Sequence, residues 1–449
     1  MAKHPNLVFV FPDELRSQAV GPCKEDPVIS PVLDAFCRES LAFTNAVSPN
    51  PVCSPFRGML FTGNYPHLNH VTQNCNTRTA PMGVYLREDE TTLSDVLKSE
   101  GYFCGYIGKW HLDAPKEEDA PYTEGRRPDG LIWDSYTPPE ARHGFDFWHV
   151  YGCCDNHNHP HYWEGGDIRD RIDVDEWSPI HETDVAVDFI KNQPKDRPFA
   201  LFLAHNPPHM PFAAVPERYL RLYDGISDDE ILYRPNIKGA TPELARDARQ
   251  YFAAITGIDE QFGRVLAAID EAGIKDDTIV IFTSDHGDMM GSQGLIRKSY
   301  IQNESYKIPF MIRWPGVLQP RVTDMLISAV DMMPTLLTML GIDARPAMQG
   351  QDIGRAILEN RDGSIGQTAF LVDNMKRRGL MDRRYTFAME VDADAASFLL
   401  YDNIHDPYQL HNLALTDEAL KKTYMRRLSA LLDEIGDPDA PSYQAFLKV

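Results

Sequence analysis

The stretch Asn6-Leu7-Val8-Phe9-Val10-Phe11 is continuously apolar after its first residue, and Asp13-Glu14 follows it almost directly. A short apolar run without polar alternation is typical of a strand that is buried on both faces. Similar runs recur at Ala200–Ala204 and Thr278–Thr283, with a shorter one at Phe310–Ile312. The first run is therefore predicted to lie inside a sheet that is covered on both sides.

Amphipathic patterns with helical spacing separate these apolar runs. The predicted helices cover Ser30–Ser40, Thr91–Glu100, Thr183–Lys191, Pro242–Ala272 and Ala329–Leu340. Strands that alternate with helices along a chain build a parallel or mixed sheet with helices on both faces. The sequence therefore predicts an α/β fold with a large mixed, mostly parallel sheet sandwiched by helices.

The pattern changes toward the C-terminus. Short strands are predicted at Ala369–Val372, Tyr385–Glu390 and Phe398–Tyr401, followed by a helix over Asp417–Ile435. We therefore expect a large α/β domain over residues 1–350 and a small C-terminal α+β subdomain with an antiparallel sheet over residues 351–449. The stretch 113–180 has weak periodicity and is predicted to form loops above the sheet, where binding residues often lie.

Composition excludes several classes of protein. The 449 residues include 44 Lys and Arg against 66 Asp and Glu, a net charge of −22, which disfavours tracking along nucleic acid. No window reaches the roughly 18 consecutive apolar residues of a membrane span, and no signal-peptide pattern opens the sequence. The seven cysteines lack paired spacing, so we expect free thiols in a cytoplasmic protein without nucleic-acid or membrane partners.

Two acidic pairs stand directly after predicted strands. Asp13-Glu14 follows the first strand, and Asp285-His286 follows the strand Thr278–Thr283. The carboxyl ends of strands in an α/β sheet are the usual place for ligands, and converging carboxylates repel each other unless a cation lies between them. A hard ion such as Ca²⁺ or Mg²⁺ suits the oxygens, while the imidazole leaves Mn²⁺ or Zn²⁺ open. Taken singly, each pair could equally be a solvated loop acid or a helix cap.

Cys53 is predicted to precede the start of a helix. Ser54 suits the N-cap and Pro55 the first helical position, so Cys53 would face N–H groups that favour an anion. Arg57 lies one turn further on and could point back at the same place. An isolated cysteine at this position could also be a structural one.

Further cationic or titratable groups follow other strands. Lys109 and His111 lie two residues apart after the strand-like Tyr102–Ile107, so both would face one way in an extended segment. His209 follows the strand Ala200–Ala204 between prolines, and Lys298 lies beyond Asp285. Each could alone be a surface or core residue. The informative signal is their joint pattern, in which three or more cationic or titratable groups follow strands.

These motifs, in this order, resemble those of the type I sulfatases of the alkaline phosphatase superfamily. Cys53-Ser54-Pro55-Phe56-Arg57 with Thr62-Gly63 is similar to the family signature Cys-x-Pro-x-Arg followed by Thr-Gly. The other matching motifs are Asp13-Glu14, Gly108-Lys109-Trp110-His111, Pro208-His209-Met210-Pro211, Ser284-Asp285-His286-Gly287 with Lys298, and the C-terminal Leu400-Tyr401-Asp402, Asp406-Pro407 and Asn412-Leu413. Glu14, Phe56 and His286 depart from the residues that are usual in the family.

The resemblance implies that Cys53 is oxidised to formylglycine by a maturation enzyme and that the aldehyde hydrate is the nucleophile. It also implies a divalent ion, usually Ca²⁺, with Mg²⁺ or Mn²⁺ as alternatives. The implied ligands are Asp13, Glu14, Asp285, His286 and the modified Cys53.

The resemblance further implies a role for each cationic residue. Arg57 and Lys109 would stabilise the ionised hydrate. His209 and Lys298 would hold the sulfate, and one of them would protonate the departing alcohol. His111 would then take the proton whose removal releases sulfate and restores the aldehyde.

The substrate is predicted to be a small sulfated molecule, a carbohydrate sulfate ester, with an aryl sulfate as a surrogate. A loop segment rich in histidine and aromatic residues would contact the sugar through His157, His159, His161, Tyr162 and Trp163. Tyr162 or Trp163 would stack on a sugar face. The alternative is a loop held together by its own histidine and aromatic packing, or an adventitious metal cluster.

Two other functions stay open. One is a phosphonate monoester or phosphodiester hydrolase of the same superfamily, which also uses a modified cysteine. Its members tend to lack the paired lysines, so Lys109 and Lys298 favour the sulfatase. The other is a non-catalytic carbohydrate-binding homologue, which requires that Cys53 stay unmodified.

Overall fold

The computed structural model describes residues 4–362, 368–371, 377–392 and 395–448. Its centre is an eight-stranded sheet in the order β10-β2-β9-β8-β1-β7-β3-β4. The strands are β1 (Asn6–Val10), β2 (Leu41–Val47), β3 (Phe103–Lys109), β4 (Phe147–Tyr151), β7 (Phe199–Ala204), β8 (Thr278–Thr283), β9 (Phe310–Arg313) and β10 (Arg321–Ser328). Only β9 among these pairs antiparallel with its neighbours, and the other pairs are parallel. The prediction of a mixed, mostly parallel sheet is confirmed.

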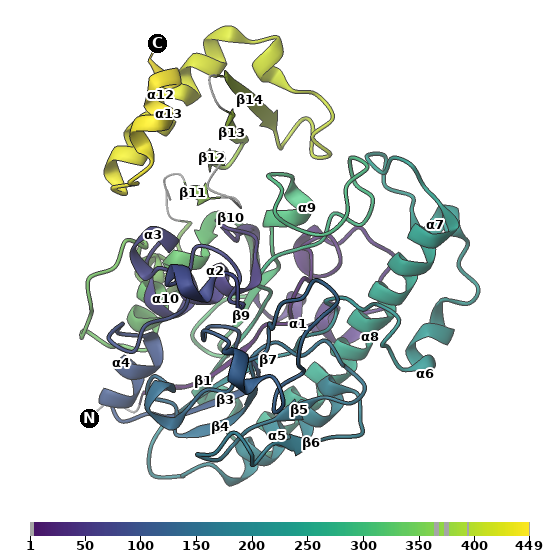
Figure 1. Cartoon of the computed structure of the whole chain (residues 1–449), viewed down its shortest axis with the longest axis vertical. Coiled ribbons are helices and arrows are strands. Elements are labelled where there is room, and N and C mark those ends of the chain that lie inside the picture. Colours follow the sequence, from purple (N-terminus) through teal and green to yellow (C-terminus); the bar gives the residue numbers. More distant parts are fainter. Residues whose placement is uncertain (1–3, 363–367, 372–376, 393–394, 449) are drawn as a thin grey trace.

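Alternate residues of β1 point into two separate apolar cores. Leu7 and Phe9 join a cluster with α2 (Cys53–Thr62), α4 (Leu93–Ser99) and α10 (Ala329–Met339). Val8 and Val10 join a cluster with α1 (Pro31–Arg38), α5 (Ser178–Asn192) and α8 (Pro242–Glu271). Since successive strand residues face opposite sides, helices cover both faces of the sheet, as predicted, and Figure 1 shows these layers.

The C-terminal part forms a second, antiparallel sheet at one end of the molecule (Figure 1). Its strands and helices are β11 (Thr368–Leu371), β12 (Arg377–Met381), β13 (Tyr385–Asp392), β14 (Ala395–Asp402), α12 (Glu418–Glu434) and α13 (Ala440–Leu447). The predicted antiparallel sheet and following helix are confirmed, while Val372 lies outside the described residues. Leu380 and Leu428 belong to the same apolar cluster as Phe61 of α2. The division at residue 350 stays a prediction, because this core continues across it.

Three strands of the main sheet differ from the sequence-based expectation. Polar residues such as Thr44 and His149 interrupt β2 and β4, and β10 begins with exposed residues at the sheet edge. β4 lies within the stretch 113–180, which was expected to form loops only. The remaining short elements are α3 (Pro66–Asn69), α6 (Glu217–Leu220), α7 (Asp228–Ile231), α9 (Asn303–Tyr306), α11 (Gly354–Leu358), β5 (His161–Tyr162) and β6 (Ile172–Asp173).

All seven cysteines are free thiols, as expected from their spacing. Cys153 and Cys154 are adjacent in the chain and both are buried. Across the described residues, no helix is both long and apolar enough to cross a membrane.

Because the two parts share one apolar core, a substitution of a buried residue in α12 should also destabilise the main sheet. Leu428 is fully buried, so Leu428→Ala should lower the free energy of unfolding by about 2–5 kcal/mol. All six tryptophans precede residue 315, so tryptophan fluorescence during urea unfolding reports on the large domain. Leu415 is 81% exposed, and Leu415→Ala should change stability by less than about 0.5 kcal/mol. An unchanged fluorescence midpoint in Leu428→Ala would show that the two parts unfold independently.

Candidate active site

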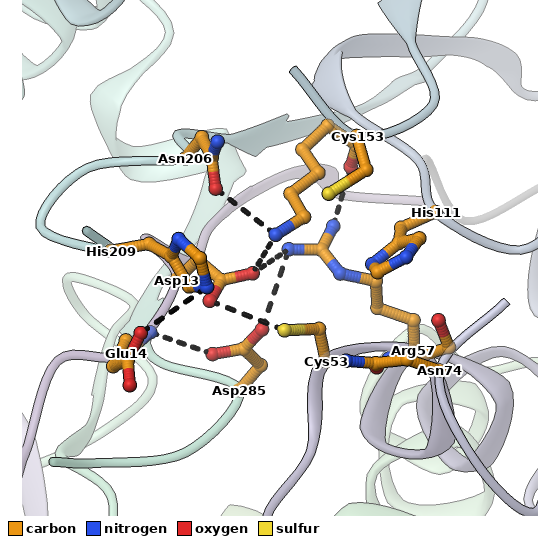
Figure 2. A network of polar contacts seen from close by, with 12 residues as sticks. Asp13, Glu14, Cys53, Arg57, Asn74, His111, Cys153, Asn206, His209 and Asp285 are labelled. Atoms are coloured by element: carbon orange, nitrogen blue, oxygen red, sulfur yellow. Dashed lines mark hydrogen bonds and ion pairs between the residues drawn. The ribbon is translucent and has the colours of Figure 1, made fainter. Parts of the chain in front are cut away.

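Four neighbouring strands bring the predicted site residues to one edge of the main sheet. The order β8-β1-β7-β3 places the ends of these strands side by side. Asp285 follows β8, Asp13 follows β1, His209 follows β7, and Lys109 ends β3. Figure 2 shows the side chains of Asp13, His209 and Asp285 pointing toward one another near the sulfur of Cys53. The parallel strands therefore assemble residues that are up to 272 positions apart, Asp13 and Asp285, in the crevice where α/β sheets usually bind ligands.

Asp13 is the centre of a buried charge network. Its Oδ2 lies 2.7 Å from Lys109 Nζ and 3.2 Å from Arg57 Nη2. The same Arg57 nitrogen lies 3.5 Å from Asp285 Oδ2, and the side chains of all four residues have no exposed surface. Burial opposes ionisation of Asp13, but Lys109 and the other basic groups around it together outweigh burial and hold the pKa of Asp13 well below its usual value. Removing either partner would leave an uncompensated buried charge.

Cys53 is the first residue of α2, which corrects one local prediction. The N-cap is Val52 and not Ser54, because the Ser54 hydroxyl faces another loop and accepts from the backbone N–H of Cys75 at 3.1 Å. The Ser54 N–H in turn donates to Asn74 Oδ1 at 3.0 Å. Cys53 is therefore held at the start of the helix by the loop that contains Asn74 and Cys75.

The sulfur of Cys53 is surrounded by charged groups. It lies 3.2 Å from Lys298 Nζ, 3.4 Å from His286 Nε2 and 3.5 Å from Asp13 Oδ1. Burial and the Asp13 carboxylate act to raise the pKa of the Cys53 thiol, but Lys109 and Lys298 lower it well below its ordinary value. The position therefore favours an anionic atom on the side chain of residue 53.

Two overlapping groups of side chains could hold a metal ion. Asp13, Cys53, Asp285 and His286 offer ligand atoms within 4.8 Å of one another, and so do Asp13, Glu14 and His209. Burial raises the pKa of Glu14 to about 8, and its Oε1 is buried without a hydrogen-bond partner among the described residues. Such a donor set, with an unsatisfied carboxylate oxygen beside it, fits a divalent cation. Four of the five predicted ligands thus fall in one group, and Glu14 falls in the other.

His111 reaches the site by a route that the sequence did not predict. Its backbone is left-handed, with φ of 54°, so the segment after Lys109 is not extended. The His111 Nε2–H donates to the carbonyl oxygen of Cys75 at 3.1 Å, and Nδ1 has no hydrogen-bond partner among the described side chains. This arrangement leaves Nδ1 as the nitrogen that can accept a proton.

His209 and Lys298 both contact Glu14 Oε2. His209 Nε2 is 3.3 Å and Lys298 Nζ is 3.4 Å from that oxygen. The His209 Nδ1–H donates to the carbonyl oxygen of Met210 at 2.8 Å, which directs Nε2 into the site. Burial, with Lys298 nearby, lowers the pKa of His209 well below its usual value, so the ring is neutral before an anion binds.

These groups line one cavity of about 470 Å³, which we call the Cys53 hollow. Its lining includes predicted residues, namely Cys53, Lys109, His111, His209 and Lys298. It also includes residues that were not predicted as site residues, namely Asn74, Arg127, Trp133, Cys153 and Asp155. Asn206, whose Oδ1 accepts from Lys109 Nζ at 3.0 Å, was also missed. The position of Asn206 after β7 was the available signal, whereas the others lie on loops without strand or helix periodicity.

The predicted stacking of Tyr162 or Trp163 on a sugar is wrong. The two side chains are 0% and 1% exposed and pack in a small apolar cluster. The Tyr162 hydroxyl donates to Glu182 Oε1 at 3.0 Å, and the Trp163 Nε1–H donates to the Ile168 carbonyl at 2.8 Å. Neither ring has a face that a substrate could reach.

The three predicted substrate-binding histidines also lie outside the Cys53 hollow. Buried His157 contacts the carbonyl oxygen of His209 through Nε2 at 2.9 Å, and buried His161 contacts Asp134 at 2.8 Å. His159 is exposed and pairs with Asp175 at 2.7 Å. His157 therefore supports the His209 loop, whereas His159 and His161 line a separate cavity of about 490 Å³.

Comparisons with known proteins agree with one another. Residues 5–342 match the family model described as Sulfatase, and residues 291–435 match the model described as N-sulphoglucosamine sulphohydrolase, C-terminal. An endo-4-O-sulfatase from Bacteroides thetaiotaomicron is 39% identical, with 97% of this chain and 93% of the relative covered. An Ulvan-active sulfatase from Formosa agariphila is 31% identical, with 96% and 82% covered. The crystal structure of yidJ from Bacteroides fragilis, also assigned to the sulfatases, superimposes with a TM-score of 0.93 at 37% identity, covering 99% and 98%.

The donor set predicts that a divalent cation stabilises the fold. At one hundred times its dissociation constant, Ca²⁺ should add about 2.7 kcal/mol of stability relative to protein in chelator. Asp285→Asn should remove most of this gain in stability. The neutral amide binds a cation more weakly than a carboxylate does, and it does not repel the Asp13 carboxylate, so less repulsion is left for the ion to relieve. The measurement is thermal unfolding with Ca²⁺ and with EDTA, with Asp247→Asn, at a partly exposed carboxylate outside the two metal-binding groups, as control. An equal gain in Asp285→Asn would place the ion elsewhere.

Proposed function

The chain belongs to the sulfatase family, as its motifs predicted, and we propose that its substrate is a sulfate ester carried by a carbohydrate. The observation that carries the proposal is the setting of the Cys53 sulfur, 3.2 Å from Lys298 Nζ and 3.5 Å from Asp13 Oδ1. A nucleophile at this position lies between cations that suit a sulfate and ligands that suit a metal. Two relatives are named as an endo-4-O-sulfatase and an Ulvan-active sulfatase, which supports a carbohydrate substrate.

Two groups are proposed to complete the site. Formylglycine, made from Cys53 by a maturation enzyme, supplies a hydrated aldehyde as nucleophile, and Ca²⁺, with Mg²⁺ or Mn²⁺ as alternatives, neutralises anionic oxygens. Asp13, Asp285 and His286 are the proposed ligands of the ion, with residue 53 itself and Glu14 beside them. The unsatisfied Glu14 Oε1 supports this assignment.

The fixed cations are proposed to bind the sulfate and stabilise the charge on residue 53. Lys298 Nζ lies at the Cys53 sulfur, and Lys109 lines the same hollow while paired with Asp13 at 2.7 Å. Arg57 is paired with both Asp13 and Asp285, so its charge is proposed to stabilise negative charge on residue 53 without contacting the sulfate. Buried cations held by partners need no reorganisation when negative charge develops in the transition state.

The two histidines are proposed to move protons at opposite ends of the reaction. His209 Nε2 faces the hollow, and an anion bound beside it would raise its low pKa so that it can protonate the departing alcohol. His111 donates from Nε2–H to the Cys75 carbonyl, so its Nδ1 is free to take a proton from the hydroxyl at residue 53. Each ring is oriented by a backbone carbonyl, which fixes its tautomer.

A cytoplasmic location is also proposed. The support is that all seven cysteines are free thiols, which is typical of proteins from reducing compartments. In an oxidising compartment the adjacent thiols of Cys153 and Cys154 could be oxidised before the chain folds and buries them.

Intact-mass analysis of protein from its native host tests the nucleophile. Conversion of the Cys53 thiol to an aldehyde lowers the mass by about 18 Da. We expect this loss in the wild type together with hydrolysis of sulfated sugars, and neither in Cys53→Ala. An unmodified thiol would favour the carbohydrate-binding alternative. A modified protein that cleaves phenyl phosphonates faster than sulfates would favour the phosphonate hydrolase.

The proposed acid predicts a loss of activity that depends on the leaving group. His209→Ala should lower kcat/KM for a sugar sulfate by about 10²–10⁴-fold, because an alkoxide leaves poorly without a proton. The loss on nitrophenyl sulfate should be much smaller, since a nitrophenolate leaves unprotonated. The 79% exposed His411 provides the control His411→Ala. Equal losses on both substrates would assign the proton to another group.

A further inference from the structure

A second cavity adjoins the Cys53 hollow. It has a volume of about 300 Å³, and we call it the Arg78 hollow. The two cavities share Asn74, Asp129 and Trp133 as lining residues. The segment 297–299 borders both, since Arg297 and Lys298 line the first and Ser299 lines the second. The reaction proposed above uses only the first cavity, so the second is available to another part of the substrate.

Trp133 lies at the border of the two cavities in a fixed orientation. Its Nε1–H donates to Asp129 Oδ2 at 2.9 Å, and the guanidinium carbon of Arg127 lies 5.7 Å from its ring centroid. The side chain is only half-buried. An oriented, partly exposed aromatic ring is a common contact for the apolar face of a ligand.

Two arginines that line the cavities differ from the other cations there. Arg297 and Arg78 are exposed, and neither side chain makes an ion pair or a hydrogen bond within the described part of the chain. The other cations in the lining are matched with carboxylates: Lys109 with Asp13, Arg127 with Asp155, and Lys298 with Glu14. Arg78 interacts electrostatically with Asp129, which lines both cavities, but the two form no ion pair. In a chain with a net charge of −22, two guanidinium groups that make no ion pair within the described residues favour an anionic ligand beside the site.

The backbone that carries Arg297 is held on several sides. Its N–H donates to Asp288 Oδ1 at 3.2 Å, and its carbonyl accepts from the Met289 N–H at 2.8 Å. Arg377 of β12 donates from Nη1 to the Ser299 carbonyl at 3.2 Å. Arg297 and Ser299 are both left-handed, with φ of 66° and 73°, an unfavourable conformation that persists only where surrounding contacts impose it. Through the contact with Ser299, the C-terminal sheet thus helps to hold the segment that places Arg297 in the lining of the Cys53 hollow.

The geometry points to an anion subsite in the Arg78 hollow for a second acidic group on the sugar next to the one that loses sulfate, with Arg78 in its lining and Arg297 in the lining of the adjoining Cys53 hollow. This inference rests on the proposed function and names its substrate class, an acidic oligosaccharide. The scissile sulfate binds in the Cys53 hollow, the sugar chain passes Trp133, and the neighbouring sugar enters the Arg78 hollow. Carboxylate and sulfate both suit a guanidinium fork, so either can be the second group.

Matched substrates test the subsite. The first is a disaccharide with one sulfate and a carboxylate on the neighbouring sugar, the second is its carboxyl-reduced form, and the third carries a sulfate in place of the carboxylate. The wild type should prefer an acidic form over the reduced form by about tenfold in kcat/KM, the effect of one charge-assisted contact. Whichever acidic form is preferred identifies the second group. The preference should shrink at high salt, which screens exposed charges.

Variants of the two arginines test whether Arg297 and Arg78 cause the preference for the acidic substrate. Arg297→Ala and Arg78→Ala should each reduce the ratio of acidic to reduced substrate, the double variant should bring it to about one, and Arg297→Lys should restore part of it. The exposed Arg426→Ala on α12 removes the same charge far from the cavities and should keep the wild-type ratio. Equal rates on reduced and acidic sugars in the wild type, or an unchanged ratio in the double variant, would overturn the subsite. Failure of the wild type to cleave any sulfated sugar would instead overturn the proposed function.

Discussion

The contact between the Asp13 carboxylate and the Lys109 ammonium, 2.7 Å apart without solvent exposure, is the constraint on which the site depends. A buried charge needs a partner of opposite charge. Here the partners form a chain of ion pairs, because Arg57 contacts both Asp13 and Asp285. The result is a compact set of positive and negative side chains around the sulfur of Cys53 (Figure 2). A site of this kind is poised for a cation and a tetrahedral anion, since each relieves repulsion that the protein alone leaves in place.

The fold supplies the rigidity that such a network requires. β1 is buried on both faces, with alternate residues in two cores, so the chain that leaves it carries Asp13 to one defined place. α2 begins at Cys53 and packs Phe61 into the same core as Leu428 of the C-terminal part. Through Arg377 the C-terminal sheet also contacts the loop that follows Lys298. Distant parts of the chain thus stabilise one another and position the reacting groups together.

Sequence patterns predicted the strands that carry the chemistry, because β1, β7 and β8 are buried on both faces and read as continuous apolar runs. They did not predict β2 and β4, where Thr44 and His149 break the pattern. The motif residues were found because most of them follow predicted strands and because their order resembles that of the type I sulfatases. Trp133 and Arg127 were missed because they lie on loops. Tertiary contacts position side chains on loops, and these contacts leave no helix or strand periodicity in the sequence. Tyr162 and Trp163 were assigned to the substrate by residue type, whereas burial gave them a structural role.

The most direct test of this account is a crystal structure of the matured protein with a divalent cation and inorganic sulfate. The account predicts the cation bound by Asp13, Asp285 and His286, and the sulfate in the Cys53 hollow between Lys298 and His209. A sulfate bound away from residue 53, or a cation that does not contact both Asp13 and Asp285, would contradict it.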